Sequence, residues 1–412
     1  MALIALVQPW PAGARELQPS EGAETGFRAS DYNPAILSLS FSAPANEPGG
    51  QQQGGEPTSE EKSQDAFLDL VLVTQTGEPF GRRVAVRKGE LQEDLKLFYR
   101  QLARQEDLNA EDPASPTRRL FSVMLGPLAE ELERQKITTL VIAAERGLQA
   151  VPFAALHDGK QYMGERFAFS ITPSLQLTSL APPSQKRGRM MAAGASKFTD
   201  LAPLPLVTQE LNGLENRGGV ERFLNQEFTP KLLLDQAVQD KYQYVHVATH
   251  AEFLPGGPDK ARIYAGTGSI SLNSFADLRQ RRKDDPIELF ALSACRTALG
   301  DQDSELGFAG LALQAGARSA IGSLWYVDDV ATSAFFLQFY RYLNAGLPKA
   351  EAMQATRKAL IEGTLHRDAD KIFAADGSVL LTDLTTEQQQ RVAKGLEHPF
   401  FWSGIELLGV PW

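Results

Sequence analysis

Cysteine is nearly absent from this chain of 412 residues, which contains Cys295 and no other. One cysteine cannot form an intrachain disulfide, and it excludes a Cys-rich zinc site or an iron–sulfur cluster built within the chain. So little cysteine fits a reducing compartment, and we expect a cytoplasmic protein. The apolar start from Met1 to Val7 is short and lacks the basic n-region of a signal peptide. A truncated signal-peptide stub, and with it a secreted protein, remains an alternative interpretation of that segment.

Long apolar runs and excess positive charge are also missing. No stretch approaches the ~20 apolar residues of a membrane-spanning helix, so we expect no membrane association. The 41 Lys and Arg residues are outnumbered by 51 Asp and Glu residues, a net charge of −10. That balance argues against direct binding of nucleic acid. The chain contains no G-x-S-x-G, Walker A or G-x-G-x-x-G motif, which removes the usual signatures of serine hydrolases, P-loop NTPases and dinucleotide-binding enzymes.

The patterns that are present alternate between strand and helix. A predicted hairpin (35–41 and 67–73) surrounds a loop at 44–65 that is rich in Gly, Gln and Glu. The other predicted strands are 138–143, 189–194, 242–249, 288–294 and 319–325. The predicted helices are 88–105, 116–135, 206–214, 229–239, 274–282, 306–315, 329–344 and 348–362. Repeated strand–helix–strand units predict an α/β fold with a mostly parallel sheet and helices on both faces.

Two reactive side chains follow neighbouring strands of this predicted sheet. His250 comes directly after strand 242–249, and Cys295 comes directly after strand 288–294. A helix between the two strands would make them parallel and adjacent. Ligands of open α/β sheets bind beyond the carboxyl ends of the strands, so both side chains are expected in one crevice.

A thiol and an imidazole in one crevice can perform acyl transfer. The imidazole takes the proton of the thiol and later delivers it to the leaving amine. The backbone N–H groups of Cys295 and Ala251 are candidates for holding the oxyanion. This chemistry needs no metal and no organic cofactor. His246 lies four strand residues before His250, or ~13 Å, too far to share a metal ion, so we interpret it as a packed strand residue.

The residues alone leave a second interpretation open. A lone buried cysteine is usually a small hydrophobic side chain. An α/β hydrolase of another kind, or a ligand-binding protein with Cys295 in its core, therefore remains an alternative.

The segments around these residues resemble the CHAT domain of caspase-like cysteine peptidases. The resemblance is carried by V-H-V-A-T-H-A (245–251), L-S-A-C-R-T-A-L-G (292–300), G-F-A-G-L-A-L-Q-A-G-A (307–317) and S-L-W-Y-V-D-D-V-A-T (323–332), and H-P-F-F-W-S-G (398–404) resembles the closing strand of the family. It covers roughly residues 65–412. It implies a caspase-like three-layer sandwich with two halves, as in the similar separases: an inactive half at 65–186 and an active half at 187–412. Residues 1–64 would supply an N-terminal strand segment and a flexible loop.

The resemblance also assigns roles to individual residues. It implies that His250 is the general base and acid, and that Cys295 is the nucleophile. An acidic residue of the L-W-x-V-x-D segment lines the S1 pocket in related enzymes and selects a basic P1 residue; Asp329 matches best, with Asp328 beside it. An Asp at this place can equally be a helix cap.

The resemblance therefore predicts a cysteine endopeptidase that cleaves a protein substrate after a basic residue. The alternative is a catalytically silent CHAT-fold module used for interaction. CHAT domains often follow repeats that bind a regulator, so the expected partners are a protein or peptide substrate and a regulatory protein.

Overall fold

The computed structural model describes most of the chain but leaves several segments out. The described ranges are 32–42, 65–75, 78–145, 147–172, 188–237, 242–253, 261–271, 286–294, 316–325 and 328–412, with the single positions 175, 180, 274, 282, 310, 312 and 313. Cys295 lies outside the described residues. So do almost all of the predicted loop at 44–65 and most of the predicted helices at 274–282 and 306–315.

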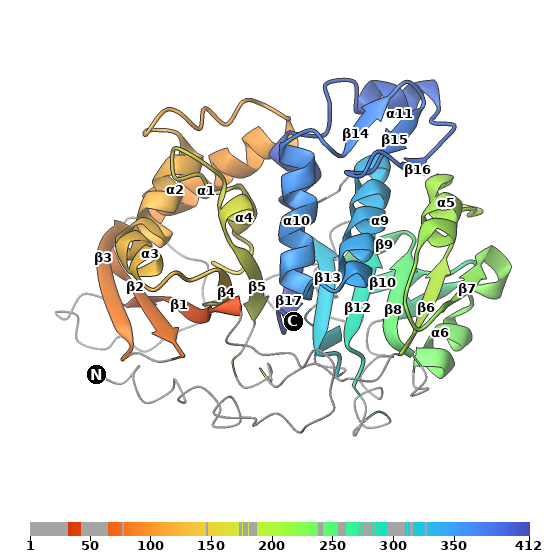
Figure 1. The fold of residues 1–412 in the computed structure, drawn as a ribbon, viewed down its shortest axis with the longest axis horizontal. Coiled ribbons are helices and arrows are strands. Elements are labelled where there is room, and N and C mark those ends of the chain that lie inside the picture. The colour runs from red at the N-terminus through yellow and green to blue at the C-terminus, as the bar shows by residue number, and fades with distance from the viewer. Residues whose placement is uncertain are drawn as a thin grey trace.

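One mixed sheet of 11 strands forms the centre of the described structure (Figure 1). Its order from edge to edge is β3 (Phe80–Arg87), β2 (Asp65–Thr74), β1 (Pro34–Ser42), β4 (Thr139–Ala144), β5 (Ala168–Thr172), β17 (Ile405–Gly409), β13 (Ser319–Ser323), β12 (Leu289–Ser293), β8 (Tyr242–Ala248), β6 (Arg189–Gly194) and β7 (Val220–Leu224). The pairings β1–β2, β2–β3 and β13–β17 are antiparallel. The other neighbours are parallel, which confirms the predicted mostly parallel α/β sheet.

Helices cover this sheet, and two small sheets flank it. The helices are α1 (Lys88–Ala103), α2 (Pro116–Met124), α3 (Ala129–Arg134), α4 (Met163–Arg166), α5 (Leu206–Gly213), α6 (Pro230–Ala237), α9 (Asp329–Ala345), α10 (Lys349–Ile361) and α11 (Thr386–Arg391). The small sheets are β9 (Ala251–Phe253) with β10 (Ala261–Tyr264) and β11 (Ser269–Ser271), and β14 (His366–Asp368) with β15 (Lys371–Phe373) and β16 (Val379–Leu381). Figure 1 shows α11 and the second small sheet together beyond one end of α9. In the described parts of the chain, no helix is long and apolar enough to cross a membrane.

The core lies on both faces of the sheet. Side chains of a strand alternate between its faces, and β6 follows this rule. Met190 and Ala192 belong to the large core that includes residues of α5, α9 and α10, whereas Met191 and Ala193 belong to a separate core that includes residues of α6. The helices on both faces that the sequence predicts are therefore present.

Two predictions, one about a helix and one about a strand, are wrong. The helix predicted at 116–135 is interrupted by a 3-10 turn at Gly126–Leu128, because Pro127 lacks a backbone N–H and its ring clashes with the preceding turn of a helix. The closing strand does not occupy 398–404, where Pro399–Phe401 forms a 3-10 turn; it follows as β17. Because β17 pairs with β5 on one side and β13 on the other, the last strand of the chain joins strands β1–β5 to strands β6, β7, β8, β12 and β13 in one sheet.

A buried ion pair lies beside this joining strand. Arg357 of α10 and Glu406 of β17 are both essentially inaccessible to solvent. Nη2 of Arg357 donates to the carbonyl of Ile405 at 2.7 Å and lies 3.3 Å from a carboxylate oxygen of Glu406. The guanidinium also stacks over the ring of Phe169 in β5, with 4.7 Å between Cζ and the ring centre. This arginine therefore contacts both β17 and β5, which are neighbours in the sheet.

Candidate active site

The two strands that precede His250 and Cys295 are neighbours. Strands β8 and β12 are parallel, with Ala248 opposite Ser293, and the backbone N–H of Thr249 donates to the carbonyl of Ser293 at 3.2 Å. The adjacency predicted from the crossover rule is confirmed. The ends of both strands therefore reach the same edge of the sheet.

A cavity of about 760 Å³ lies at this edge. Its walls come from the ends of β8 and β12, the segment that enters α5, the first turn of α9, and α11. The lining residues used below are Ala202, Glu210, Thr249, His250, Ser293, Ala294, Asp328, Asp329, Ser333, Gln388 and Arg391. A cavity beyond the carboxyl ends of parallel strands is where an α/β sheet usually binds its ligand.

His250 is held by its backbone and by its ring. Its carbonyl accepts from the N–H of Tyr264 in β10 at 3.0 Å, and the hydroxyl of Thr249 donates to the carbonyl of Tyr264 at 2.5 Å. The imidazole packs against Phe198 with 4.8 Å between ring centres. Its Nε2 lies 2.8 Å from the carbonyl of Ala202. A carbonyl oxygen only accepts, so Nε2 carries the hydrogen and Nδ1 is the basic atom of the neutral ring.

The structure places the two residues that precede Cys295 at the cavity but does not describe Cys295 itself. Ser293 and Ala294, which directly precede it, line the cavity. The hydroxyl of Ser323 donates to the carbonyl of Ala294 at 2.8 Å, which fixes the end of β12 against the neighbouring strand. Ala251, the other oxyanion candidate, begins β9 directly after His250 and pairs with Ile263.

His246 is a packed strand residue, as predicted, and it belongs to a buried hydrogen-bond network. It is fully buried, and its Nε2 lies 2.8 Å from Glu210 of α5. The second carboxylate oxygen of Glu210 accepts from the hydroxyl of Ser333 at 2.6 Å. Nδ1 of His246 lies 3.2 Å from the hydroxyl of Tyr340, whose pKa burial raises well above its ordinary value. This network links β8, α5 and α9 directly beneath the cavity.

The two S1 candidates lie in the cavity wall, and both are paired. Asp328 caps α9 by accepting from the N–H groups of Val330 and Ala331 at 2.9 and 3.2 Å. Nε of Arg391 donates to Asp328 at 2.6 Å, and a terminal nitrogen of the same guanidinium bonds Asp329. Burial raises the pKa of Asp328, and the Arg391 guanidinium opposes that rise. Both the cap and the pocket interpretations therefore fit Asp328.

The two roles of Asp328 can be separated by substitution. Asp328→Ala removes the cap of α9, and the free energy of unfolding is expected to fall by about 1–2 kcal/mol. Asp328→Asn retains a side-chain oxygen that can accept from the same two N–H groups, so most of that stability should remain. Urea unfolding of both variants measures the difference. Equal losses in the two variants would contradict the capping role.

Arg391, Gln388 and Glu210 are cavity residues that the sequence analysis does not identify. Arg391 and Gln388 come from a six-residue helix about sixty positions after the aspartates. The only local signal is the capping box of Thr385 and Gln388, which marks the start of the helix but not its docking site. Glu210 is a charged residue in a predicted helix. Its position below the cavity becomes clear only from its contact with the buried His246, which the sequence does not show.

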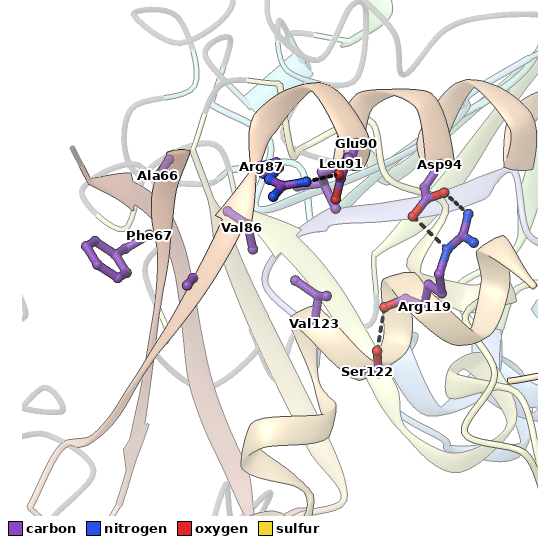
Figure 2. A pocket seen from close by; sticks show the side chains of 11 residues that line it. Ala66, Phe67, Val86, Arg87, Glu90, Leu91, Asp94, Arg119, Ser122 and Val123 are labelled. Carbon is purple, nitrogen blue, oxygen red and sulfur yellow. Dashed lines mark hydrogen bonds and ion pairs between the residues drawn. The ribbon is translucent and has the colours of Figure 1, made fainter. Parts of the chain in front are cut away.

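A second cavity, of about 650 Å³, lies between β2, β3, α1 and α2 (Figure 2). Its charged groups pair with one another, as the dashed lines show: Arg87 with Glu90 at 2.7 Å, and Arg119 with Asp94 at 2.9 Å. Among the described residues, no group of three His, Cys, Asp or Glu side chains is arranged to hold a metal ion. The candidate chemistry is therefore concentrated at the cavity that contains His250.

The chain was compared with protein families, curated proteins and solved structures. A family model described as the CHAT domain matches residues 114–410. A search of curated proteins found no match. Among solved structures, the chain is similar to the Saccharomyces cerevisiae separase–securin complex, with 10% identity, a TM-score of 0.48 and coverage of 93% of this chain but 30% of that one. It is also similar to the Arg-specific cysteine proteinase gingipain R of Porphyromonas gingivalis, with 11% identity, a TM-score of 0.41 and coverage of 78% and 75%.

Proposed function

The chain belongs to the CHAT domain family, and from this premise we propose that it is a cysteine endopeptidase that cleaves a protein substrate after a basic residue. The observation that supports this most is the position of His250. Its ring lies in the wall of a cavity at the carboxyl edge of the sheet, and that wall also contains Ala294, the residue before the only cysteine of the chain. Consecutive Cα atoms are about 3.8 Å apart, so the proposed nucleophile follows a residue of this wall by one Cα–Cα step.

The proposed reaction uses His250 as the carrier of one proton. Nδ1 takes the proton of the Cys295 thiol, and Sγ attacks the carbonyl carbon of the scissile peptide bond. The carbon–nitrogen bond then breaks as His250 delivers the proton to the leaving amine. Water hydrolyses the thioester and regenerates the thiol. The contact between Nε2 and the carbonyl of Ala202 keeps the ring oriented with Nδ1 as the base, and it stabilises the imidazolium that forms.

The transition state also needs donors for the oxyanion. The N–H groups of Ala251 and Cys295 follow the ends of β8 and β12, the two strands that meet at the cavity. Backbone donors of this kind need no side chain, so alanine after the histidine is compatible with the role.

The proposed preference for a basic P1 residue follows from the charge of the cavity. Among the residues that the structure describes, its wall contains four carboxylates, those of Glu210, Asp328, Asp329 and Glu387, and one arginine, Arg391. Glu210 is buried and bonded to the network of His246, and Glu387 is largely exposed to solvent. The two aspartates, which the chain itself pairs with Arg391, are therefore the candidates for pairing with an incoming cation.

A peptide screen tests this function. Fluorogenic peptides with Arg, Lys or Asp at P1 are offered to the wild type and to Cys295→Ala. We expect turnover of the Arg and Lys peptides by the wild type and none by the variant. Equal turnover by Cys295→Ala would eliminate the proposed nucleophile, and a preference for Asp would eliminate the proposed role of Asp329. Absence of turnover with every peptide would favour the non-catalytic interaction module.

A further inference from the structure

The two candidate S1 aspartates are already paired with a cationic side chain of the same protein, that of Arg391. Every oxygen of their carboxylates is engaged within the protein. One oxygen of Asp328 accepts the two N–H groups that it caps, and the other accepts Nε of Arg391 at 2.6 Å. One oxygen of Asp329 bonds Arg391, and the other accepts Nε2 of Gln388 at 3.1 Å. A substrate guanidinium that approached these two carboxylates would find each of their oxygens already accepting a hydrogen bond from the protein.

Arg391 is placed so that its guanidinium can leave without unfolding α11. The helix is anchored by the buried Leu384 just before it and the buried Val392 just after it, which are 3% and 0% exposed. The Arg391 side chain, at the end of the helix, is 38% exposed. Its third acidic neighbour, Glu387, lies 3.7 Å away and is 85% exposed, so that pair contributes little. Rotation of this one side chain towards solvent would therefore free one oxygen of each aspartate while the backbone of α11 stays in place.

We propose that Arg391 occupies, from within the chain, the position of a substrate's basic P1 side chain, and that such a substrate binds only by displacing the Arg391 guanidinium from Asp328 and Asp329. This inference rests on the proposed function, because it assigns the occupant of the same S1 pocket. Arg391 is then a specificity-determining residue: it lowers the apparent affinity for every basic P1 residue by the fraction of molecules in which the pocket is occupied. It leaves binding of a neutral P1 residue, which does not need the aspartates, largely unaffected.

Substitution of Arg391 in an inactive background tests the proposal without relying on catalysis. The probe is a fluorescein-labelled peptide with Arg at P1, and its neutral counterpart carries citrulline, which has nearly the same shape. Binding is measured by fluorescence anisotropy to Cys295→Ala, alone and combined with Arg391→Ala or Arg391→Gln. We expect Arg391→Ala to tighten binding of the Arg peptide by about tenfold, and to leave the citrulline peptide unchanged. Arg391→Gln should tighten it as well, since the positive charge is gone.

A matched control comes from the other end of the sheet. Arg83 donates its Nε to Asp69 at 2.6 Å, the same distance as between Arg391 and Asp328, but it lies on the edge strand β3. Arg83→Ala should leave binding of both peptides unchanged. Thermal unfolding of each variant confirms that the fold is retained.

The outcomes separate this proposal from the proposed function. Unchanged or weaker binding of the Arg peptide in both Arg391 variants would contradict the proposal that Arg391 occupies the S1 pocket, even if the wild type cleaves after arginine. Tighter binding of the Arg peptide alone would support it, even if no variant with Cys295 intact cleaves any peptide. Tighter binding of both peptides would also overturn it, because the effect would then not depend on the charge of P1.

Discussion

Hydrolysis of a P1-Arg peptide by His250→Ala is expected to fall about 10²–10⁴-fold in kcat/KM, the usual contribution of a positioned general base and acid. The loss should appear mainly in kcat, because His250 transfers a proton in the proposed mechanism and does not contact the P1 side chain. The orientation of its ring supports this role, since the bond between Nε2 and the carbonyl of Ala202 leaves Nδ1 basic. Initial rates over a range of peptide concentrations give both constants.

Added imidazole distinguishes proton transfer from a structural role. The alanine variant leaves space in the wall of a cavity of about 760 Å³, so free imidazole should enter and restore part of kcat. His366→Ala is the matched control: this histidine is exposed on β14 and stacks on Phe373, and its loss should leave kcat/KM unchanged. Full activity of His250→Ala would remove His250 from the mechanism. A reduced rate that imidazole does not change would leave His250 with a structural role.

Removal of the buried cation beside β17 is expected to have the largest effect on stability. Arg357→Met leaves the carboxyl of Glu406 buried without its partner, and the free energy of unfolding should fall by about 3–5 kcal/mol. The double variant Arg357→Met/Glu406→Leu removes both buried polar groups and should recover most of that loss. Urea unfolding of the wild type, both single variants and the double variant gives the coupling. A double variant as unstable as the sum of the single variants would contradict the interaction.

The pH dependence of the same variants provides a second check. Burial raises the pKa of Glu406 to about 8, and Arg357 opposes the rise. Between the ordinary carboxyl pKa of ~4.5 and 8, the folded state therefore binds more protons than the unfolded state, so this group lowers stability as pH rises. Without Arg357 the pKa rises further, and the decline in stability should continue to higher pH. A variant that is stabilised by rising pH would contradict this origin of the shift.

The sequence predicts the central architecture because the relevant signals are local. Short segments rich in apolar and aromatic residues mark β8 and β12, and the crossover rule makes them adjacent, so the ends at His250 and Ala294 meet as expected. The patterns do not predict the edge strands β3 and β7, where arginines and glutamates interrupt the apolar residues and solvent covers one edge. The resemblance to the family places the closing strand at 398–404, which is too early, because Pro399, Phe400 and Phe401 form a 3-10 turn before the strand begins.

The residues that line the cavity are harder to predict, because segments far apart in the sequence pack together to form it. The aspartates of the L-W-x-V-x-D segment are visible in the sequence, but the arginine that pairs with them is not. Arg391 belongs to a helix of six residues whose only sequence signal is its cap, and nothing local indicates that it returns to the start of α9. Glu210 is hidden for the same reason, since its role depends on the histidine beneath it.

The rate at which iodoacetamide alkylates the protein, measured across pH, tests the central claim most directly. Cys295 is the only cysteine, so the modification reports on that thiol alone. If His250 and Cys295 act together, the wild type should react with an inflection well below the ~8.5 of a free thiol, and His250→Ala should return the inflection to about that value. A wild-type inflection at or above ~8.5, unchanged by removal of the imidazole, would contradict the dyad.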